Sequence, residues 1–281
     1  MTAPPDRRIA AHRPDLADRR LEGLVAAGQF VEGERWRIAL ASVPLRAAPR
    51  PDLPFETEAL RGEVVRVFEE TIEGWAWGQI ETDGYVGYFS ADALGPLAPE
   101  PTHRVIVPRT FLYPAPDLRR PPREALSLGA TLALGEAVET RGTLYRMTAD
   151  GAAAVVDRHV APLDAPHADD WVAVAEGFLG APYLWGGRTS LGLDCSALVQ
   201  LSLAACGIAA PRDSDLQESA VGRPAEGPPR RGDLVFWPGH VGLVAADETL
   251  LHASGFQMQV VREPLAGAIA RIGAPRSIRR L

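Results

Sequence analysis

Lysine is absent from this sequence of 281 residues, so arginine supplies all 29 basic side chains, against 36 acidic ones. The resulting net charge of −7 offers no basic surface for a nucleic acid or for an anionic membrane. We therefore expect no nucleic-acid partner and no membrane partner.

Cysteine is scarce, with only Cys195 and Cys206 in the chain. If the residues between them are helical, the two Cα atoms lie about 16 Å apart, at about 1.5 Å per residue. A disulfide requires Cα atoms within about 7 Å of each other. The helix thus excludes a disulfide, and Cys206 is expected to be a buried small apolar residue near the helix end.

Long apolar runs are also missing. The first twenty residues, MTAPPDRRIAAHRPDLADRR, are charged and lack the apolar core of a secretory signal, and no later run approaches a membrane span. We expect a cytoplasmic location.

The apolar content of 46% is sufficient for a substantial core, and the length favours two or three domains. The 27 glycines and 25 prolines predict many turns and short strands, chiefly in the first half. The six histidines are scattered without the spacing of a zinc site, so neither a metal nor a cofactor is expected.

The most informative stretch is GGRTSLGLDCSALVQ, residues 186–200. A glycine-rich loop gives way there to apolar residues at helical spacing, which puts Cys195 on the first turn of a helix. Free amide groups and the positive end of the helix dipole stabilise a thiolate, which predicts a lowered thiol pKa and a reactive cysteine.

Two histidines provide a base for this thiol. His240 in PGHVGLV and His252 in LHAS each lie in a short apolar segment of strand character. Two neighbouring antiparallel strands beside the cysteine helix would let His240 take the thiol proton while His252 orients its ring. Taken singly, each of the three residues is also compatible with a purely structural place in a core.

The first half divides into small strand-rich domains. Residues 1–34 form an extension with a possible helix over 17–33, and alternating segments from residue 35 to 99 predict a small barrel with a hairpin turn at Asp83-Gly84. Its aromatic residues are as compatible with a barrel core as with ligand binding. These residues are Trp75, Trp77, Tyr85, Tyr88 and Phe89.

Residues 100–163 predict a second, similar barrel, because LGEAV at 134–138 echoes LRGEV at 60–64. A linker, 164–170, then leads to the last domain, 168–281. The segment 171–180, WVAVAEGFLG, has helical spacing and is expected to pack against the cysteine helix.

Five segments of the last domain together resemble the NlpC/P60 family of cell-wall peptidases, which are papain-like cysteine hydrolases. They are APYLWGG (181–187), LDCSALVQ (193–200), PRDSDLQ (211–217), GDLVFWPGHVGLV (232–244) and LHAS (251–254). Upstream, ETEALRGE (56–63) and GWAWGQIETDGYVGYF (74–89) resemble the bacterial SH3 domains that precede this peptidase in γ-D-glutamyl-L-diamino acid endopeptidases. The resemblance implies an α+β fold, a papain-like domain preceded by two small SH3-like β-barrels.

The resemblance also implies roles for residues around the nucleophile. Tyr183 is expected beside Cys195, where its hydroxyl helps the Cys195 N–H to bind the oxyanion; a core tyrosine is the alternative. Asp194 and Ser214, with Ser196 beside the nucleophile, are expected to bind the free α-amino group of an L-alanine. Asp194 is equally suited to be a helix N-cap.

In this family the first SH3 domain supplies a tyrosine and a glutamate to the same amino group, for which Tyr85 and Glu56 are the candidates. The implied reaction is hydrolysis of the γ-D-glutamyl bond to diaminopimelate or lysine in free murein peptides that begin L-Ala-γ-D-Glu. Such an enzyme serves cell-wall recycling. The alternatives are a peptidoglycan-stem binding protein with an inactive peptidase domain and a papain-like amidase or acyltransferase.

Overall fold

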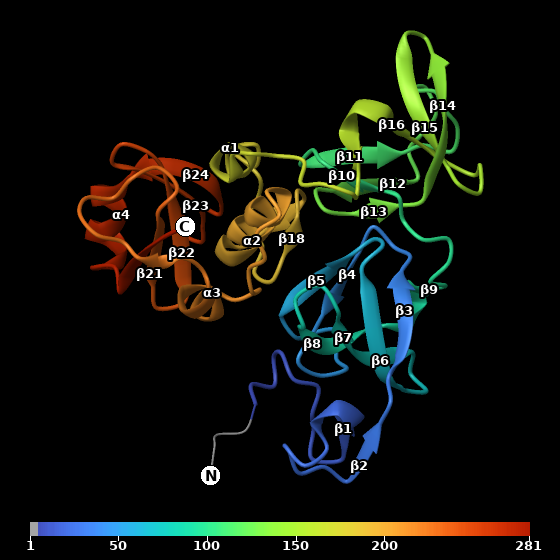
Figure 1. Ribbon diagram of the computed structural model, residues 1–281, viewed down its shortest axis with the longest axis horizontal. Coiled ribbons are helices and arrows are strands. Elements are labelled where there is room, and N and C mark those ends of the chain that lie inside the picture. The colour runs from blue at the N-terminus through green and yellow to red at the C-terminus, as the bar shows by residue number, and fades with distance from the viewer. Residues whose placement is uncertain (1–4) are drawn as a thin grey trace. The chain divides into compact units, whose positions relative to one another are not determined.

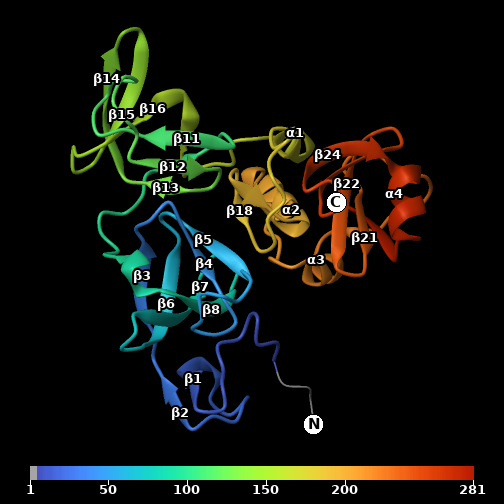
Figure 2. The same ribbon diagram turned by 180° about the vertical axis from the view of Figure 1, so that it is seen from behind.

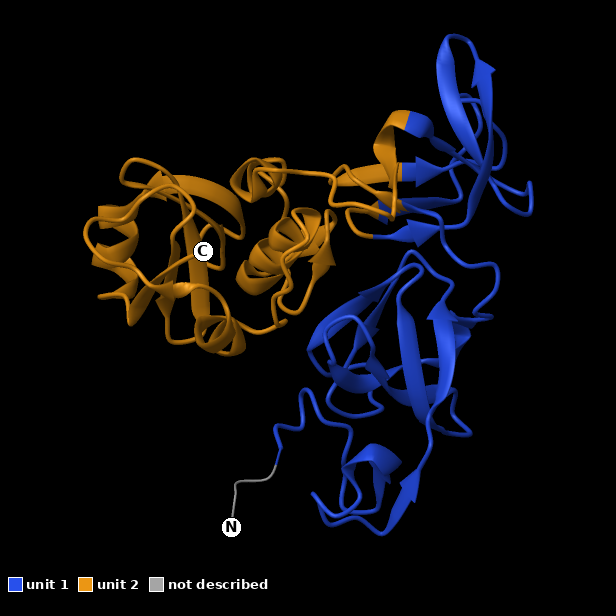
Figure 3. Cartoon of the chain, viewed as in Figure 1, with its two compact units in different colours: residues 1–103, 111–126, 130–157 blue, residues 104–110, 127–129, 158–281 orange. Residues whose placement is uncertain are grey.

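The computed structural model describes residues 5–281, and the first four residues of the predicted extension 1–34 lie outside that range. The chain divides into two compact units (Figure 3), unit 1 with residues 1–103, 111–126 and 130–157, and unit 2 with residues 104–110, 127–129 and 158–281. Within the described residues no helix combines the length and the apolar character that crossing a membrane requires.

Most of unit 1 before residue 100 is a strongly bent β structure, drawn in blue to green in Figure 1. A five-stranded sheet has the order β8-β7-β6-β3-β9, and β4 pairs with β5. The bounds are β3 (Glu34–Ile38), β4 (Ser42–Leu45), β5 (Thr57–Leu60), β6 (Val64–Glu70), β7 (Trp75–Ile80), β8 (Val86–Ser90), η2 (Ala91–Ala93) and β9 (Leu94–Gly95). Apolar residues that alternate along these strands form the core, including Ile38, Leu45, Val65, Ile80, Tyr85 and Phe89.

The hairpin predicted at Asp83-Gly84 is present, since β7 and β8 pair in antiparallel fashion around it. Gly84 has φ of 78°, a left-handed conformation that glycine adopts without steric cost. For the aromatic residues of this region the sequence leaves a core place and a binding role equally open. Trp77, Tyr85 and Phe89 are buried in the structure.

The helix predicted over residues 17–33 is wrong. The segment instead contains β1 (Leu16–Asp18), the short 3₁₀ helix η1 (Arg19–Leu21) and β2 (Gln29–Val31), and β1 and β2 pair in parallel. Leu16 packs on Phe68 and Trp77, whereas Leu24 is 68% exposed. Tertiary packing of Leu16 therefore outweighs the helical spacing of the apolar residues.

Residues 103–162 consist of short strands and one 3₁₀ turn. The bounds are β10 (His103–Val105), β11 (Arg109–Leu112), β12 (Glu124–Ser127), β13 (Thr131–Leu132), β14 (Leu134–Thr140), β15 (Thr143–Thr148), β16 (Ala154–Val156), η3 (Asp157–His159) and β17 (Val160–Pro162). The sheet β14-β15-β16 lies wholly within unit 1.

Unit 2 contains a six-stranded sheet of order β20-β25-β21-β22-β23-β24. Its strands are β20 (Arg223–Pro224), β21 (Leu234–Trp237), β22 (His240–Ala246), β23 (Thr249–Ser254), β24 (Gln259–Pro264) and β25 (Ser277–Arg280). A separate two-stranded ladder joins β18 (Arg188–Thr189) to β19 (Gly192–Leu193).

The helices of unit 2 are α1 (Trp171–Glu176), α2 (Cys195–Ala205), α3 (Ser214–Ala220) and α4 (Leu265–Ile272). Within this unit α4 and α2 lie on opposite sides of the sheet, as both views show (Figures 1 and 2). Leu265 and Ala268 of α4 pack on Val235, Val244 and Leu250 of the sheet, while α2 contacts α1, β22 and β23. The sheet is thus covered on both faces, which explains its almost continuous apolar strands.

Candidate active site

Cys195 is the first residue of α2, as the glycine-to-apolar transition predicted. Asp194 caps this helix, because its Oδ1 accepts the N–H of Ala197 at 2.8 Å. The preceding loop is compact: a Cβ added to Gly187 would lie 2.4 Å from the carbonyl oxygen of Gly192. Glycine at position 187 therefore lets the loop turn tightly into the helix that carries the thiol.

A buried arginine holds the cap in place. Arg212 Nη2 donates to Asp194 Oδ2 at 2.7 Å, and Arg212 Nη1 donates to Asp194 Oδ1 and Ser196 Oγ at 2.9 Å each. The Arg212 side chain is completely buried, so this carboxylate compensates its charge. Ser196 Oγ also donates to Asp194 Oδ1 at 3.1 Å. Both residues that flank Cys195 thus stabilise the start of α2.

Arg212 is not among the residues predicted from the sequence, although it lies in the same PRDSDLQ motif as Ser214. Ser214 begins α3 and is half-buried. An arginine in a loop is usually exposed, and nothing in the local sequence distinguishes this one from the others.

The predicted direction of the Cys195 pKa is wrong. The residue is only 6% exposed, and burial, with a smaller contribution from Asp194, raises the pKa of its thiol to about 12. The N–H groups of Val241 and Ser196 and the charge of Arg212 oppose this rise, but loss of water outweighs them. The resting thiol is therefore neutral and needs a base.

The two histidines lie on adjacent antiparallel strands, His240 at the start of β22 and His252 in β23. His240 Nε2 lies 2.7 Å from His252 Nδ1. A Cβ added to Gly242 would lie 2.8 Å from Leu250 Cδ1 and 3.2 Å from the Cβ of His252, so glycine there lets β22 lie close to the side chains of β23. The two adjacent strands place the two rings in direct hydrogen-bond contact.

Burial also determines the charge state of the histidines. It lowers the pKa of His240 to about 4, and a proton on His252 and the charge of Arg271 lower it further. Burial likewise lowers the pKa of His252, against the effect of its bond to Glu263. Both rings are neutral near pH 7, as a base and its orienting partner require.

A carboxylate that was not predicted from the sequence, Glu263, contacts the histidine pair. His252 Nε2 lies 2.7 Å from Oε1 of Glu263 on β24. Arg271 of α4 donates to both oxygens of Glu263: Nη2 donates to Oε1, and Nη1 donates to Oε2 at 2.8 Å. The bond to Arg271, followed by that to His252, lowers the pKa of Glu263 to about 2. This carboxylate is therefore ionised.

Cys195 and His240 are linked through their neighbours. The N–H of Val241, which follows His240, acts on the thiol, and Asp194 acts electrostatically on both Cys195 and His240. Tyr183 belongs to the same region, because Cys195 and Asp194 add to the effect of burial in raising its pKa. The N–H of Tyr183 donates to the Met258 carbonyl at 2.9 Å, which fixes the loop that carries the phenol.

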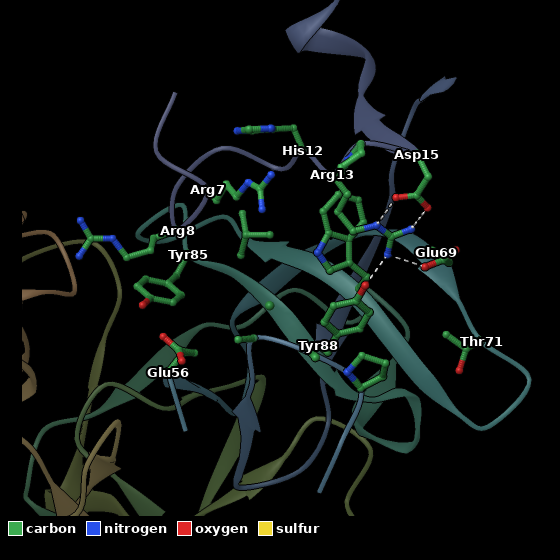
Figure 4. A pocket seen from close by; sticks show the side chains of 17 residues that line it. Arg7, Arg8, His12, Arg13, Asp15, Glu56, Glu69, Thr71, Tyr85 and Tyr88 are labelled. Carbon is green, nitrogen blue, oxygen red and sulfur yellow. Dashed lines mark hydrogen bonds and ion pairs between the residues drawn. The ribbon is translucent and has the colours of Figure 1, made fainter. Parts of the chain in front are cut away.

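The remaining candidates, Glu56 and Tyr85, lie in unit 1. Both line a cavity of about 690 Å³, and in Figure 4 the Tyr85 hydroxyl and the Glu56 carboxylate point toward each other. The Tyr85 ring is only 2% exposed and belongs to the barrel core. Core packing therefore fixes the direction of its hydroxyl.

Comparison with known proteins agrees with this architecture. Residues 180–271 match the NlpC/P60 family, and residues 45–94 match the bacterial dipeptidyl-peptidase SH3 domain. These matches define two domains of the chain, a bacterial SH3 domain followed by an NlpC/P60 domain. The chain carries an NlpC/P60 domain and a bacterial SH3 domain, as its motifs predicted.

Several relatives cover different shares of the chain. The gamma-D-glutamyl-L-lysine dipeptidyl-peptidase of Bacillus subtilis (strain 168) is 28% identical over 225 residues, which is 72% of this chain and 73% of that protein. Dipeptidyl-peptidase 6 of Lysinibacillus sphaericus is 32% identical over 120 residues, 37% of this chain and 42% of that protein. The chain thus spans less than half of this second relative.

A crystal structure of an NlpC/P60 family protein from Bacillus cereus ATCC 10987 has the same fold. It superposes with a TM-score of 0.71 at 23% identity and covers 88% of this chain and 99% of that one. The predicted mixture of helix and strand and the NlpC/P60 fold with an SH3 domain are confirmed. The second barrel and the individual site roles stay predictions.

Proposed function

We propose that the chain is a cysteine peptidase with Cys195 as nucleophile and His240 as base. The observation that supports this most strongly is the 2.7 Å contact between His240 and His252, on strands against which the cysteine helix packs. A buried cysteine at a helix start next to an oriented imidazole is an arrangement suited to nucleophilic catalysis.

The resting charges define the first step. Because thiol and imidazole are both neutral, the proton passes from Cys195 Sγ to His240 as sulfur attacks the substrate carbonyl carbon. The C–N bond then breaks, the proton moves from His240 to the leaving amine, and a thioester remains on Cys195. Water deprotonated by His240 hydrolyses the thioester and restores the thiol.

The tetrahedral intermediate requires donors for its oxyanion. We assign this role to the Cys195 N–H and the Tyr183 hydroxyl. The Cys195 N–H belongs to the first turn of α2, where amide groups have no partner inside the helix. Tyr183 keeps its proton at neutral pH because burial raises its pKa, so it acts as a donor.

The proposed substrate is a free murein peptide that begins L-Ala-γ-D-Glu, cut at the bond to diaminopimelate or lysine. The name of the Bacillus subtilis relative, a gamma-D-glutamyl-L-lysine dipeptidyl-peptidase, supports this bond. We assign the free amino group of the peptide to Glu56, Tyr85, Asp194, Ser196 and Ser214. Asp194 already accepts five hydrogen bonds, from Gly186, Ser196, Ala197 and both terminal nitrogens of Arg212, so the ammonium has to replace one of these donors.

The domain organisation proposed with this function has four parts. They are an extension (1–34), a first SH3-like domain (35–99), a second (100–163) and the peptidase domain (168–281). The many short strands of residues 103–162 support the second barrel. Recognition of a free amino group restricts cleavage to peptides already released from the glycan, which favours a recycling role in the cytoplasm.

Mass spectrometry of the products tests this proposal. The full chain is incubated with L-Ala-γ-D-Glu-L-Lys, with the diaminopimelate analogue, with an N-acetylmuramyl-capped form and with the α-linked isomer. We expect L-Ala-D-Glu to be released from the free γ-linked peptides alone. Equal cleavage of the capped peptide would overturn the recognition of the amino group, and cleavage of none would overturn the substrate.

A variant of the barrel tests the amino-group assignment separately. Glu56→Gln removes a negative charge that faces the ammonium, so KM for the free peptide should rise about tenfold with kcat preserved. Glu73→Gln, in an exposed turn of the same unit, is the matched control. An unchanged KM in Glu56→Gln would remove Glu56 from the binding site.

A further inference from the structure

The histidine pair does not end at His252. The contacts form a continuous chain from His240 through His252 to Glu263 and Arg271, with 2.7 Å at each of the two histidine contacts. The side chains of His252 and Glu263 are only 1% and 12% exposed, so water does not compete strongly for these bonds.

The direction of each hydrogen bond follows from Glu263, the carboxylate at the end of this series of contacts. An ionised carboxylate only accepts hydrogen bonds, so His252 must carry a proton on Nε2 to donate to Glu263. In the neutral ring Nδ1 of His252 is then an acceptor, and His240 must donate to it from Nε2. The neutral ring of His240 therefore has its lone pair on Nδ1.

We propose that Glu263 is a positioning residue for the reaction: its carboxylate, held by Arg271, keeps both histidines in the tautomers that leave Nδ1 of His240 ready to receive the thiol proton. This inference rests on the proposed roles of Cys195 and His240. Glu263 does not touch the reacting atoms and acts only through His252.

Charge gives Glu263 a second effect. When His240 becomes an imidazolium, the carboxylate stabilises it, whereas Arg271 opposes it. The structure shows both signs, since Glu263 raises and Arg271 lowers the pKa of His240. Asp194 also acts on the pair, since it raises the pKa of His240, and it is unchanged in the variants below.

Two variants should shift the pH profile of kcat/KM in opposite directions. Glu263→Ala lowers the pKa of the histidine pair, so the acid limb moves to lower pH by about half a unit or more. Its plateau falls about 10- to 100-fold through kcat, because the ring is less well oriented and is a weaker base. Arg271→Met moves the acid limb to higher pH. A purely structural role for either residue would move neither limb.

Further variants keep the test decisive. Glu263→Gln retains the volume of the side chain and serves if the alanine variant fails to fold; it should also move the acid limb to lower pH. Glu176→Gln is the matched control, because Glu176 pairs with Arg262, the neighbour of Glu263 on the same strand, at 2.7 Å on the surface. The proposal would be overturned if Glu263→Ala, Glu263→Gln and Arg271→Met all had the same acid limb as the control Glu176→Gln.

The tautomers can be observed without substrate. In protein labelled with ¹⁵N-histidine, long-range ¹H–¹⁵N spectra should show both His240 and His252 protonated on Nε2, with assignments from His240→Gln and His252→Gln. A proton on Nδ1 of His252 in the unmodified protein would contradict the proposed hydrogen-bond direction.

The proposed function and the role of Glu263 can fail separately. Full turnover by Cys195→Ala would overturn the thiol mechanism whatever Glu263 does. Loss of turnover in Cys195→Ala together with unshifted acid limbs in the Glu263 and Arg271 variants would overturn only the positioning role.

Discussion

The site of unit 2 is flanked by two arginine–carboxylate pairs that differ in burial. Arg212 pairs with Asp194 at the start of the cysteine helix, and the exposed fractions of the two side chains are 0% and 12%. Arg271 pairs with Glu263 behind the histidines, and the corresponding fractions are 26% and 12%. The two carboxylates are thus equally exposed, and the pairs differ in the arginine, which is enclosed in the first pair and partly exposed to solvent in the second.

The partners explain what each pair does. Asp194 also accepts hydrogen bonds from the N–H groups of Ala197 and Gly186, so its pair with Arg212 fixes the backbone around Cys195. Glu263 binds the ring of His252 instead. The enclosed pair should therefore affect mainly the stability of the fold, and the partly exposed pair mainly the state of the base.

The largest expected effect follows from breaking the enclosed pair. Arg212→Met leaves the Asp194 carboxylate buried without its cation, and the free energy of unfolding should fall by about 3–5 kcal/mol. Urea unfolding at pH 7 measures the change. Arg262→Met, which removes a surface arginine of the same unit, is the control and should stay within about 0.5 kcal/mol of the parent. Equal effects of the two variants would remove the contrast.

A smaller effect on the free energy of unfolding is expected from His240, and it should depend on pH. The pKa of His240 is lowered to about 4 in the folded protein, against about 6.5 in the unfolded chain. The unfolded state therefore binds the proton more readily. The contribution of the neutral His240 ring to the free energy of unfolding is present in full above pH 6.5 and is lost as pH falls toward 4. The expected loss is roughly 2–3 kcal/mol.

His240→Gln isolates that contribution. Unfolding of the parent and the variant is compared at pH 7 and pH 4.5, and the variant should lose less stability between these values. Identical losses would show that His240 is not buried as a neutral ring.

The smallest effect on stability is expected at the partly exposed pair. Arg271→Met should change the free energy of unfolding at pH 7 by no more than about 1 kcal/mol, although it shifts the pH profile of activity. A loss as large as that of Arg212→Met would mean that the two pairs have the same structural role.

The parts of the candidate site that have a local signature could be predicted from the sequence. Cys195 follows a glycine-rich loop and begins an apolar helix, and both histidines stand in short apolar strands, so local patterns were enough. Arg212 and Glu263 were not predicted because their partners are distant in the sequence. Arg212, for example, lies 18 residues from Asp194. With 29 arginines and no lysine, composition gives no means of choosing the one that is buried.

The errors have the same physical origin. The apolar spacing within residues 17–33 is helical, yet Val31 and the preceding Leu16 pack on the cluster of Phe68 and Trp77, and the segment forms strands. For Cys195 the helix start was recognised, but the pKa depends on burial by strands far along the chain. Local sequence specified the elements, and long-range packing specified their electrostatics.

The central claim is that Cys195 is the nucleophile, and turnover of L-Ala-γ-D-Glu-L-Lys by Cys195→Ala tests it most directly. Cys206→Ser is the matched control, since it removes the only other cysteine. We expect kcat/KM to fall by about 10³-fold or more in Cys195→Ala and to stay within about twofold of the parent in Cys206→Ser. Turnover by Cys195→Ala above about a tenth of the parent value would contradict the proposed mechanism.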